Sequence, residues 1–248
     1  MTDLDGKTAL VVGAGRGLGR GVALALAEAK ASVVAVARTG PDLAELTAAS
    51  GRIRAETVDA ADPEVAWRLL DRHEPDVLVL AAGANPVMRP LQHHTWETFS
   101  ANWNADVRIA FTWLREALLK PLPPGSRIMV VSSGAAIGGS PVSGGYAGAK
   151  AAQRFIAGYA QDESDRAGLG LTVTALLPKM TPHGGIGRRG IRAYAARNGE
   201  SEEAFLKRLG DPLTPGQTGS AVLDLVRTDP AEIAAGYLLT AAGLKELP

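Results

Sequence analysis

The chain has 248 residues, enough to bury one sizeable hydrophobic core, and an α/β sheet of this length commonly forms a single domain. Its 26 basic and 26 acidic residues balance, so its charge gives no reason to expect a nucleic acid or an anionic membrane as partner. It has no cysteine, which excludes disulfides, thiolate nucleophiles and thiolate zinc ligands. The start of the chain is unlike a signal peptide and no apolar stretch approaches the ~20 residues that cross a bilayer, so we expect a cytoplasmic protein.

The first predicted strand, residues 8–12, runs directly into a glycine-rich turn and a helix. The turn reads G-x-x-x-G-x-G and departs from the GxGxxG of dinucleotide sites, because its sixth position is Leu18. A glycine turn alone is often only a tight connection, but a strand before it and a helix after it favour a phosphate site. Unpaired N–H groups and the helix dipole attract a pyrophosphate there. The candidate residues are Gly13, Gly15, Arg16, Gly17, Leu18 and Gly19.

The end of the second predicted strand, residues 32–37, bears on the choice of cofactor. NAD-binding folds place an acidic residue there to hold the ribose 2′-hydroxyl, whereas an arginine suits a 2′-phosphate. This strand ends in Ala37, and Arg38 and Arg16 offer two guanidinium groups. The sequence therefore favours NADP(H) over NAD(H), although either arginine alone would also fit an ordinary surface charge.

Further strands are predicted at residues 53–58, 76–82, 127–131, 171–177 and 235–240, with helical segments between them. The longest helical segment covers residues 95–120. Strands alternating with helices are typical of a parallel sheet with crossover connections. We predict a Rossmann-like, doubly wound α/β fold of about seven strands with helices on both faces, formed by residues 1–248 as one domain.

The strongest catalytic candidates are Ser133, Tyr146 and Lys150. Ser133 ends the fifth strand, where such sheets bind ligands, and Tyr146 and Lys150 share one face of the next helix. A free tyrosine holds its proton to about pH 10, so a tyrosine that acts as acid or base near neutral pH needs a positive charge nearby. The serine hydroxyl would donate to a substrate oxygen that becomes negative. Tyr-x-x-x-Lys alone is common by chance. The catalytic interpretation is favoured here because the glycine turn occurs in the same chain.

In their order and spacing these motifs resemble the short-chain dehydrogenase/reductase family, of the single-domain type. The resemblance implies an oxidoreductase of the carbonyl reductase or alcohol dehydrogenase type, in which Tyr146 transfers the proton, Lys150 assists it and Ser133 stabilises the oxyanion. It implies that Asn104 holds a water that connects Lys150 to solvent. Besides the glycine turn, Tyr146 and Lys150, the implied cofactor contacts are Arg38, Asp59, Ala60, Ala82, Gly83, Pro178, Lys179 and Thr181.

Two segments depart from the family's usual pattern. Leu80-Ala81-Ala82-Gly83 stands where the family usually has Asn-Asn-Ala-Gly, and Pro178-Lys179 stands where it usually has Pro-Gly. We hypothesise that Lys179 narrows the nicotinamide pocket. An unchanged cofactor affinity and turnover in Lys179→Gly would contradict this.

Residues 181–215 are rich in glycine and arginine, and the resemblance implies that they form a lid over a small carbonyl or alcohol substrate. Four arginines there would either select an anionic substrate or, more simply, form a solvated helix face: Arg188, Arg189, Arg192 and Arg197. We predict no metal site, because the adjacent His93 and His94 cannot share a helix face.

A homodimer or homotetramer is implied through the small-residue helix that Tyr146 opens and the helical segment with Trp96, Trp103 and Trp113. Two other functions stay open at this point. One is a dinucleotide-binding sensor or scaffold without turnover, and the other is a lyase-like reaction at the same tyrosine.

Overall fold

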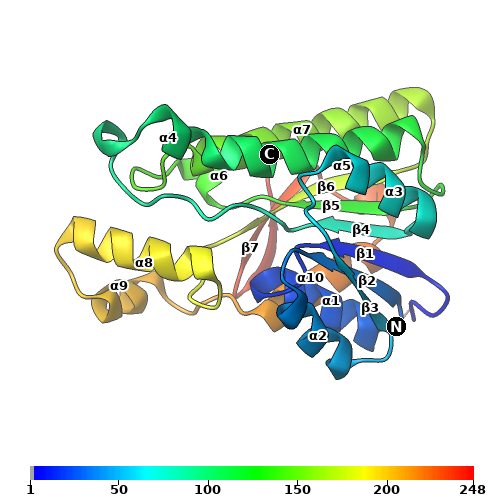
Figure 1. Ribbon diagram of the computed structural model, residues 1–248, viewed down its shortest axis with the longest axis horizontal. Coiled ribbons are helices and arrows are strands. Elements are labelled where there is room, and N and C mark those ends of the chain that lie inside the picture. Colours follow the sequence, from blue (N-terminus) through cyan, green and yellow to red (C-terminus); the bar gives the residue numbers. More distant parts are fainter. Residues whose placement is uncertain (1–2) are drawn as a thin grey trace.

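The computed structural model describes residues 3–248, and its centre is one eight-stranded sheet with helices on both faces (Figure 1). The strand order is β3-β2-β1-β4-β5-β6-β7-β8; β8 is antiparallel to β7 and every other pair is parallel. The strands are β1 (Thr8–Val12), β2 (Ser32–Ala37), β3 (Ile53–Thr57), β4 (Val77–Leu80), β5 (Arg127–Val131), β6 (Thr172–Pro178), β7 (Gly236–Thr240) and β8 (Gly243–Glu246).

The predicted doubly wound fold is confirmed, with one strand more than the expected seven. The chain turns back at Gly243, whose φ of +111° suits glycine, and residues after it pair with β7. This strand could not be predicted from sequence, because its short, largely exposed segment lacks the apolar run of the buried strands.

Helices α1 (Gly17–Glu28), α2 (Gly40–Ala49) and α10 (Pro215–Arg227) cover one face of the sheet. Helices α3 (Pro63–His73), α5 (Arg108–Leu119) and α7 (Tyr146–Ala167) cover the other. The remaining helices are α4 (Trp96–Asn102), α6 (Ala135–Gly138), α8 (Gly185–Asn198) and α9 (Glu202–Leu209). None of the helices within residues 3–248 combines the length and apolarity needed to cross a membrane.

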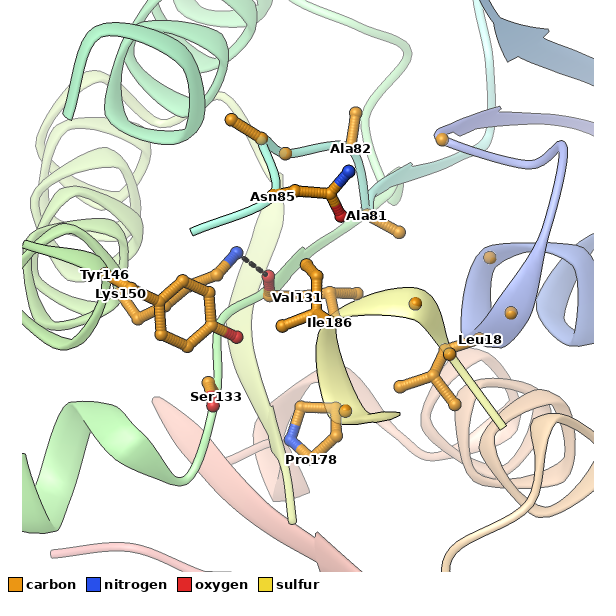
Figure 2. Close-up of a pocket in the computed structure, with 18 of the residues that line it drawn as sticks. Leu18, Ala81, Ala82, Asn85, Val131, Ser133, Tyr146, Lys150, Pro178 and Ile186 are labelled. Atoms are coloured by element: carbon orange, nitrogen blue, oxygen red, sulfur yellow. Dashed lines mark hydrogen bonds between the residues drawn. The ribbon is translucent and has the colours of Figure 1, made fainter. Parts of the chain in front are cut away.

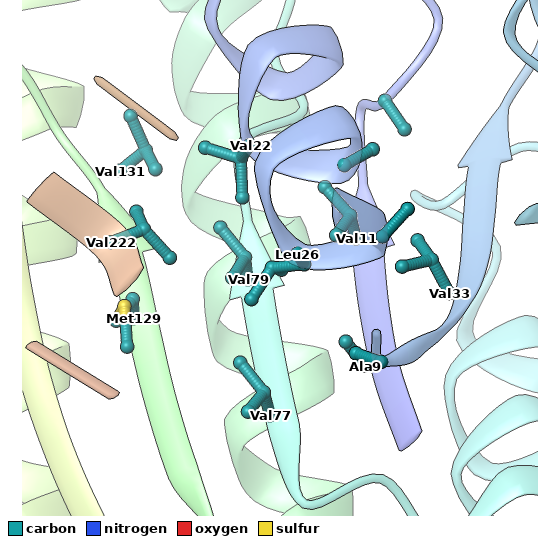
Figure 3. Close-up of a cluster of buried hydrophobic side chains, with 14 of the residues drawn as sticks. Ala9, Val11, Val22, Leu26, Val33, Val77, Val79, Met129, Val131 and Val222 are labelled. Carbon is teal, nitrogen blue, oxygen red and sulfur yellow. The ribbon is translucent and has the colours of Figure 1, made fainter. Parts of the chain in front are cut away.

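The core follows from the two-residue period of the strands, which sends successive side chains to opposite faces. In β1, Ala9 and Val11 pack towards α1 and α10, while Leu10 and Val12 pack towards α3 and α5. Figure 3 shows the first of these layers, where Val11 lies among side chains of α1 and of the neighbouring strands. This rigid sheet fixes the positions of the loops at its carboxyl edge.

The helical segment predicted at residues 95–120 is divided by a π-helical turn, Trp103–Val107, between α4 and α5; we call it the π turn. A π turn adds a residue to one turn of helix and changes which side chains face inward after it. Trp113 of α5 is fully buried, so it cannot belong to the surface proposed for oligomer formation, whereas Trp96 and Trp103 are exposed.

Candidate functional site

A cavity of about 780 Å³ opens at the carboxyl ends of the strands (Figure 2). Open α/β sheets bind their ligands at this edge. Every cofactor or catalytic candidate named from the sequence except Asn104 lines it: Gly13, Gly15, Arg16, Gly17, Leu18, Gly19, Arg38, Asp59, Ala60, Ala82, Gly83, Ser133, Tyr146, Lys150, Pro178, Lys179 and Thr181. The cavity therefore brings together segments that are more than 160 residues apart in the chain.

The glycine turn forms a cradle at one end of the cavity. A Cβ atom at Gly13 would lie 2.5 Å from the backbone nitrogen of Ala82, and one at Gly19 would lie 2.2 Å from the carbonyl oxygen of Gly13. α1 starts at Gly17, and Arg16 before it provides no side-chain cap. The first N–H groups of α1 thus have no partner inside the helix, and a pyrophosphate of a dinucleotide fits this turn.

Beside this cradle the cavity wall carries charged groups of both signs. The exposed side chains of Arg16 and Arg38 line it, and neither guanidinium has an ion pair or a hydrogen bond within the described part of the chain. Asp42, at the start of α2, lines it too, and its Cβ would lie 3.2 Å from a Cβ built on Gly15. This carboxylate could not be recognised from sequence, because it lies five residues beyond the end of β2.

Asp59 and Ala60 follow β3 and are held by the protein itself. The carboxylate of Asp59 accepts a hydrogen bond of 3.0 Å from the N–H of Ala61. The indole N–H of Trp113 donates to the carbonyl of Ala60 at 3.0 Å. This buried tryptophan of α5 therefore fixes the turn that lines the middle of the cavity.

Lys150 lies almost wholly buried on the first turns of α7 and is surrounded by acceptors. Its ammonium forms an ion pair of 3.1 Å with Asp106 Oδ2, and it donates to Gln153 Oε1 at 2.9 Å and to the carbonyl of Val131 at 3.3 Å (Figure 2). Burial by itself would lower the pKa of Lys150, but the attraction of Asp106 and of Tyr146 outweighs it, and the pKa of Lys150 lies above its ordinary value. Lys150 is therefore charged at neutral pH.

Tyr146 and Ser133 complete the group of side chains around Lys150. Tyr146 is the first residue of α7, and its ring centroid lies 5.6 Å from the Lys150 ammonium. Ser133 follows β5, and its oxygen accepts a bond of 3.2 Å from the N–H of Ala135, which leaves its own O–H to donate elsewhere. A tyrosine beside a buried ammonium and a hydroxyl donor on one cavity can exchange a proton with a bound molecule and stabilise negative charge on it.

The structure does not bring Asn104 to this group. Asn104 lies exposed on the π turn, and its amide donates to Ser100 at 3.4 Å. Asn102, the last residue of α4, and Asp106, on the π turn, are the polar residues buried here instead. The structure thus places Asn104 outside the group around Lys150, and its link to Lys150 through a water stays a prediction.

The other end of the cavity is mostly apolar. It is lined by Ile137, by Met88 and Met180, and by Ile186 and Tyr194 of α8. The hydroxyl of Tyr194 lies 2.5 Å from that of Ser140, which joins α8 to the loop after α6. Four arginines of α8 are absent from the wall: Arg188, Arg189, Arg192 and Arg197. Lys179 lines the cavity and is exposed at the end of β6.

Ser143 supplies a polar atom at this end. Its side chain is buried and lines the cavity, and its hydroxyl has no hydrogen-bond partner within residues 3–248. A buried hydroxyl without a partner is costly, so it is an available donor or acceptor for a bound molecule.

Comparison with known proteins places this geometry in a family. The sequence pattern of the short chain dehydrogenases matches residues 7–187, which span the cradle, the catalytic candidates and the start of α8. The chain belongs to the short-chain dehydrogenase family. It is an oxidoreductase of that family, whose members bind a nicotinamide dinucleotide.

Individual relatives are distant. L-xylulose reductase of Mesocricetus auratus is 29% identical to this chain over 180 residues, which are 73% of this chain and 68% of that protein. A short chain dehydrogenase from Mycobacterium avium superposes with a TM-score of 0.78 and 24% identity, covering 100% of this chain and 87% of that one. A NAD⁺-bound xylitol dehydrogenase superposes with a TM-score of 0.83 and 20% identity, covering 95% and 97%. These two structures establish the fold.

Sequence reasoning overlooked several residues of this short-chain dehydrogenase site: Asp42, Asn102, Asp106, Ser143, Gln153 and Tyr194. Gln153 had a signal, since it lies three residues after Lys150 and so on the same face of α7. Asp106 had none, because its inward position depends on the π turn.

Proposed function

We propose that the protein is an NADP(H)-dependent oxidoreductase that interconverts a ketone or aldehyde and an alcohol. The observation that carries the proposal is the presence of Ser133, Tyr146 and Lys150 on the same cavity wall as the glycine cradle. The family membership supports hydride chemistry, and these three side chains supply what the oxygen of a carbonyl needs when it becomes an alkoxide.

Each side chain has a role in the proposed reaction. The glycine cradle, Pro178, Lys179 and Thr181 would hold the dinucleotide, which when bound would supply or accept the hydride. Tyr146 gives its phenolic proton to the substrate oxygen during reduction and takes it back during oxidation. Lys150 keeps a positive charge beside that phenol, and Ser133 donates its free O–H to the same substrate oxygen.

The preference for NADP(H) rests on Arg16 and Arg38, whose guanidinium groups line the cavity near the cradle and have no partner among residues 3–248. A 2′-phosphate would pair with either of them, whereas a ribose hydroxyl needs a carboxylate. Asp42 favours NAD(H) instead, since it brings a carboxylate to the same end. Two cations against one anion favour the phosphate.

The substrate end favours a neutral compound with an apolar body next to its carbonyl. Methionine, isoleucine and tyrosine side chains line this end, and the arginines of α8 lie outside it. An anionic substrate would leave its charge without a guanidinium partner there. Residues 181–215, with α8 and α9, would act as the lid that encloses such a substrate.

The test is a panel of carbonyl compounds and alcohols, with xylulose and xylitol included, assayed by the absorbance of NADPH and NADH. We expect wild-type protein to consume NADPH with apolar ketones or aldehydes, and Tyr146→Phe to lose at least ~100-fold in kcat while still binding NADPH, because it lacks the proton donor. Tyr159→Phe, an exposed tyrosine on the same helix, should retain full activity.

The outcomes separate the possible functions. NADPH binding without consumption by any compound would point to a sensor or scaffold. Conversion of a substrate without net consumption of NADPH, lost in Tyr146→Phe, would point to a lyase-like reaction. Equal NADPH oxidation by wild type and Tyr146→Phe would remove Tyr146 from the mechanism.

A further inference from the structure

Asp106 is a buried carboxylate at the centre of the site, and its position is determined by several contacts. Its Oδ1 accepts a bond of 2.7 Å from the N–H of Ala84 and one of 3.3 Å from the amide of Asn102. Its backbone carbonyl accepts a bond of 2.8 Å from Gln153. These contacts direct Oδ2 at Lys150, 3.1 Å away, with no exposed surface on the aspartate side chain.

The segment around Ala82-Gly83 is adapted to this carboxylate. A Cβ atom at Gly83 would lie 2.7 Å from Asp106 Oδ2, closer than real side chains approach. The amide of Asn102, the last residue of α4, also donates to the carbonyl of Ala84 at 2.9 Å. Two hydrogen bonds therefore join the loop after β4 to the helical segment, and a third, from Asn102 to Asp106, lies within that segment. The chain has thus been fitted around a negative charge that no part of the proposed reaction uses.

We propose that Asp106 is a positioning residue for the proton transfer: its carboxylate holds the Lys150 ammonium in place and, through it, sets the pH range in which Tyr146 exchanges its proton. The inference rests on the proposed function in one respect, that Tyr146 is the residue that transfers the proton. The ion pair of Asp106 with Lys150, the π turn and the close approach of Gly83 are observed independently of that function.

The charge of Asp106 acts in the same direction on the protons of Lys150 and Tyr146. A negative charge makes the loss of any neighbouring proton harder, so Asp106 holds the proton on Lys150 and also opposes formation of a phenolate at Tyr146. Without Asp106, the phenol would meet a Lys150 ammonium whose charge is no longer offset, and at higher pH burial would favour loss of the proton from that ammonium. Both groups should then lose their protons at lower pH.

Few other charges act at this point. Tyr146 of α7 and Asp106 of the π turn are the ionisable groups whose charges act on Lys150, and β5 presents the carbonyl of Val131. Lys179, at the end of β6, lines the same cavity but is exposed. The remaining charged residues of the wall are Arg16, Arg38 and Asp42 beside the glycine cradle and Asp59 in the middle of the cavity. Asp106 is thus the nearest negative charge to the ammonium.

The experiment compares wild type with Asp106→Asn, which keeps the shape and an acceptor for the N–H of Ala84 but removes the charge. Tyr146 ionisation is followed in the free protein by phenolate absorbance, with the Tyr146→Phe background subtracted, and kcat for alcohol oxidation is measured against pH. We expect the midpoint of the Tyr146 titration to move about one pH unit lower, and the kcat profile to move with it and gain a falling alkaline limb.

Two further variants keep the test decisive. Gln153→Glu adds a negative charge beside the same ammonium and should move the midpoint to higher pH; it also serves if Asp106→Asn does not fold. Asp162→Asn makes the same substitution at an exposed position of α7 and should leave titration and profile unchanged.

A loss of kcat or stability in Asp106→Asn with an unmoved titration midpoint would show that Asp106 is only structural and would overturn the inference. So would shifts of the same sign in Asp106→Asn and Gln153→Glu. If no wild-type turnover is found, the proposed function fails, while the titration of the free protein still tests the role of Asp106.

Discussion

Arg38 and Asp106 represent two kinds of residue in this site. A cofactor contact for Arg38 can be predicted from sequence, since Arg38 stands directly after an apolar strand whose carboxyl end reaches the cavity. The position of Asp106 beside Lys150 cannot be predicted in that way. The family resemblance pointed to Asn104 two residues earlier, and only the backbone of the π turn decides which of the two side chains faces Lys150.

Arg38 provides a test of cofactor choice. Arg38→Ser removes one of the two guanidinium groups proposed for the 2′-phosphate, and we expect the KM for NADPH to rise about 10-fold, the effect of losing one charge-assisted contact. The KM for NADH should change less than 2-fold, because NADH lacks that phosphate. Steady-state kinetics with each cofactor measure both values, and equal changes for the two cofactors would contradict the assignment.

At the scale of helices and strands, the strands of the sheet could be predicted from sequence. Which side chains of the helical segment at residues 95–120 face inward could not. Strands β1, β2 and β5 were located to the residue, because buried parallel strands are short apolar runs bounded by turns. The segment at residues 95–120 was correctly predicted as helical. Its division by the π turn depends on contacts with the loop after β4, which local sequence does not encode.

The contact between α8 and the loop after α6 gives a prediction for the lid. Tyr194→Phe removes the hydroxyl that lies 2.5 Å from Ser140, and a hydrogen bond of this kind contributes about 1 kcal/mol. We expect substrate KM to rise about 5-fold with little change in kcat, and limited proteolysis within residues 181–215 to become faster.

Ser140→Ala should have the same effect, and the double variant should be no worse than either single one, because both substitutions remove one interaction. Additive losses in the double variant would show that the two hydroxyl groups act separately. Steady-state kinetics on the three variants decide between these results.

At the scale of the whole molecule, the exposed aromatic side chains of α5 and α7 stand out. Phe111 of α5 and Phe155 and Tyr159 of α7 are each more than half exposed, with fractions of 55%, 61% and 62%. The two helices pack against each other on the outer side of the sheet, and the rings of Phe155 and Tyr159 stack at 6.5 Å. Large apolar groups gathered on one surface of this kind favour contact with a second copy of the chain.

We therefore expect a homo-oligomer in solution that depends on this surface. Phe155→Arg should lower the molar mass measured by light scattering to that of a smaller species, because a buried unpaired guanidinium would oppose association. Trp67→Arg on α3, an exposed aromatic residue outside the group of Phe111, Phe155 and Tyr159, should leave the mass unchanged. Equal masses for wild type and Phe155→Arg would place any interface elsewhere.

The π turn also acts as a phase shift between the two halves of one helical segment. Each residue of an α-helix advances its neighbour by about 100°, so deleting a single residue within Trp103–Val107 would rotate α4 by that amount relative to α5. Trp113 anchors α5 in the core, so α4 would be the part that turns. Asn102 would then leave the loop after β4, and Asp106 would lose a partner without being mutated. The length of this segment is therefore as much a determinant of the site as the identity of its residues.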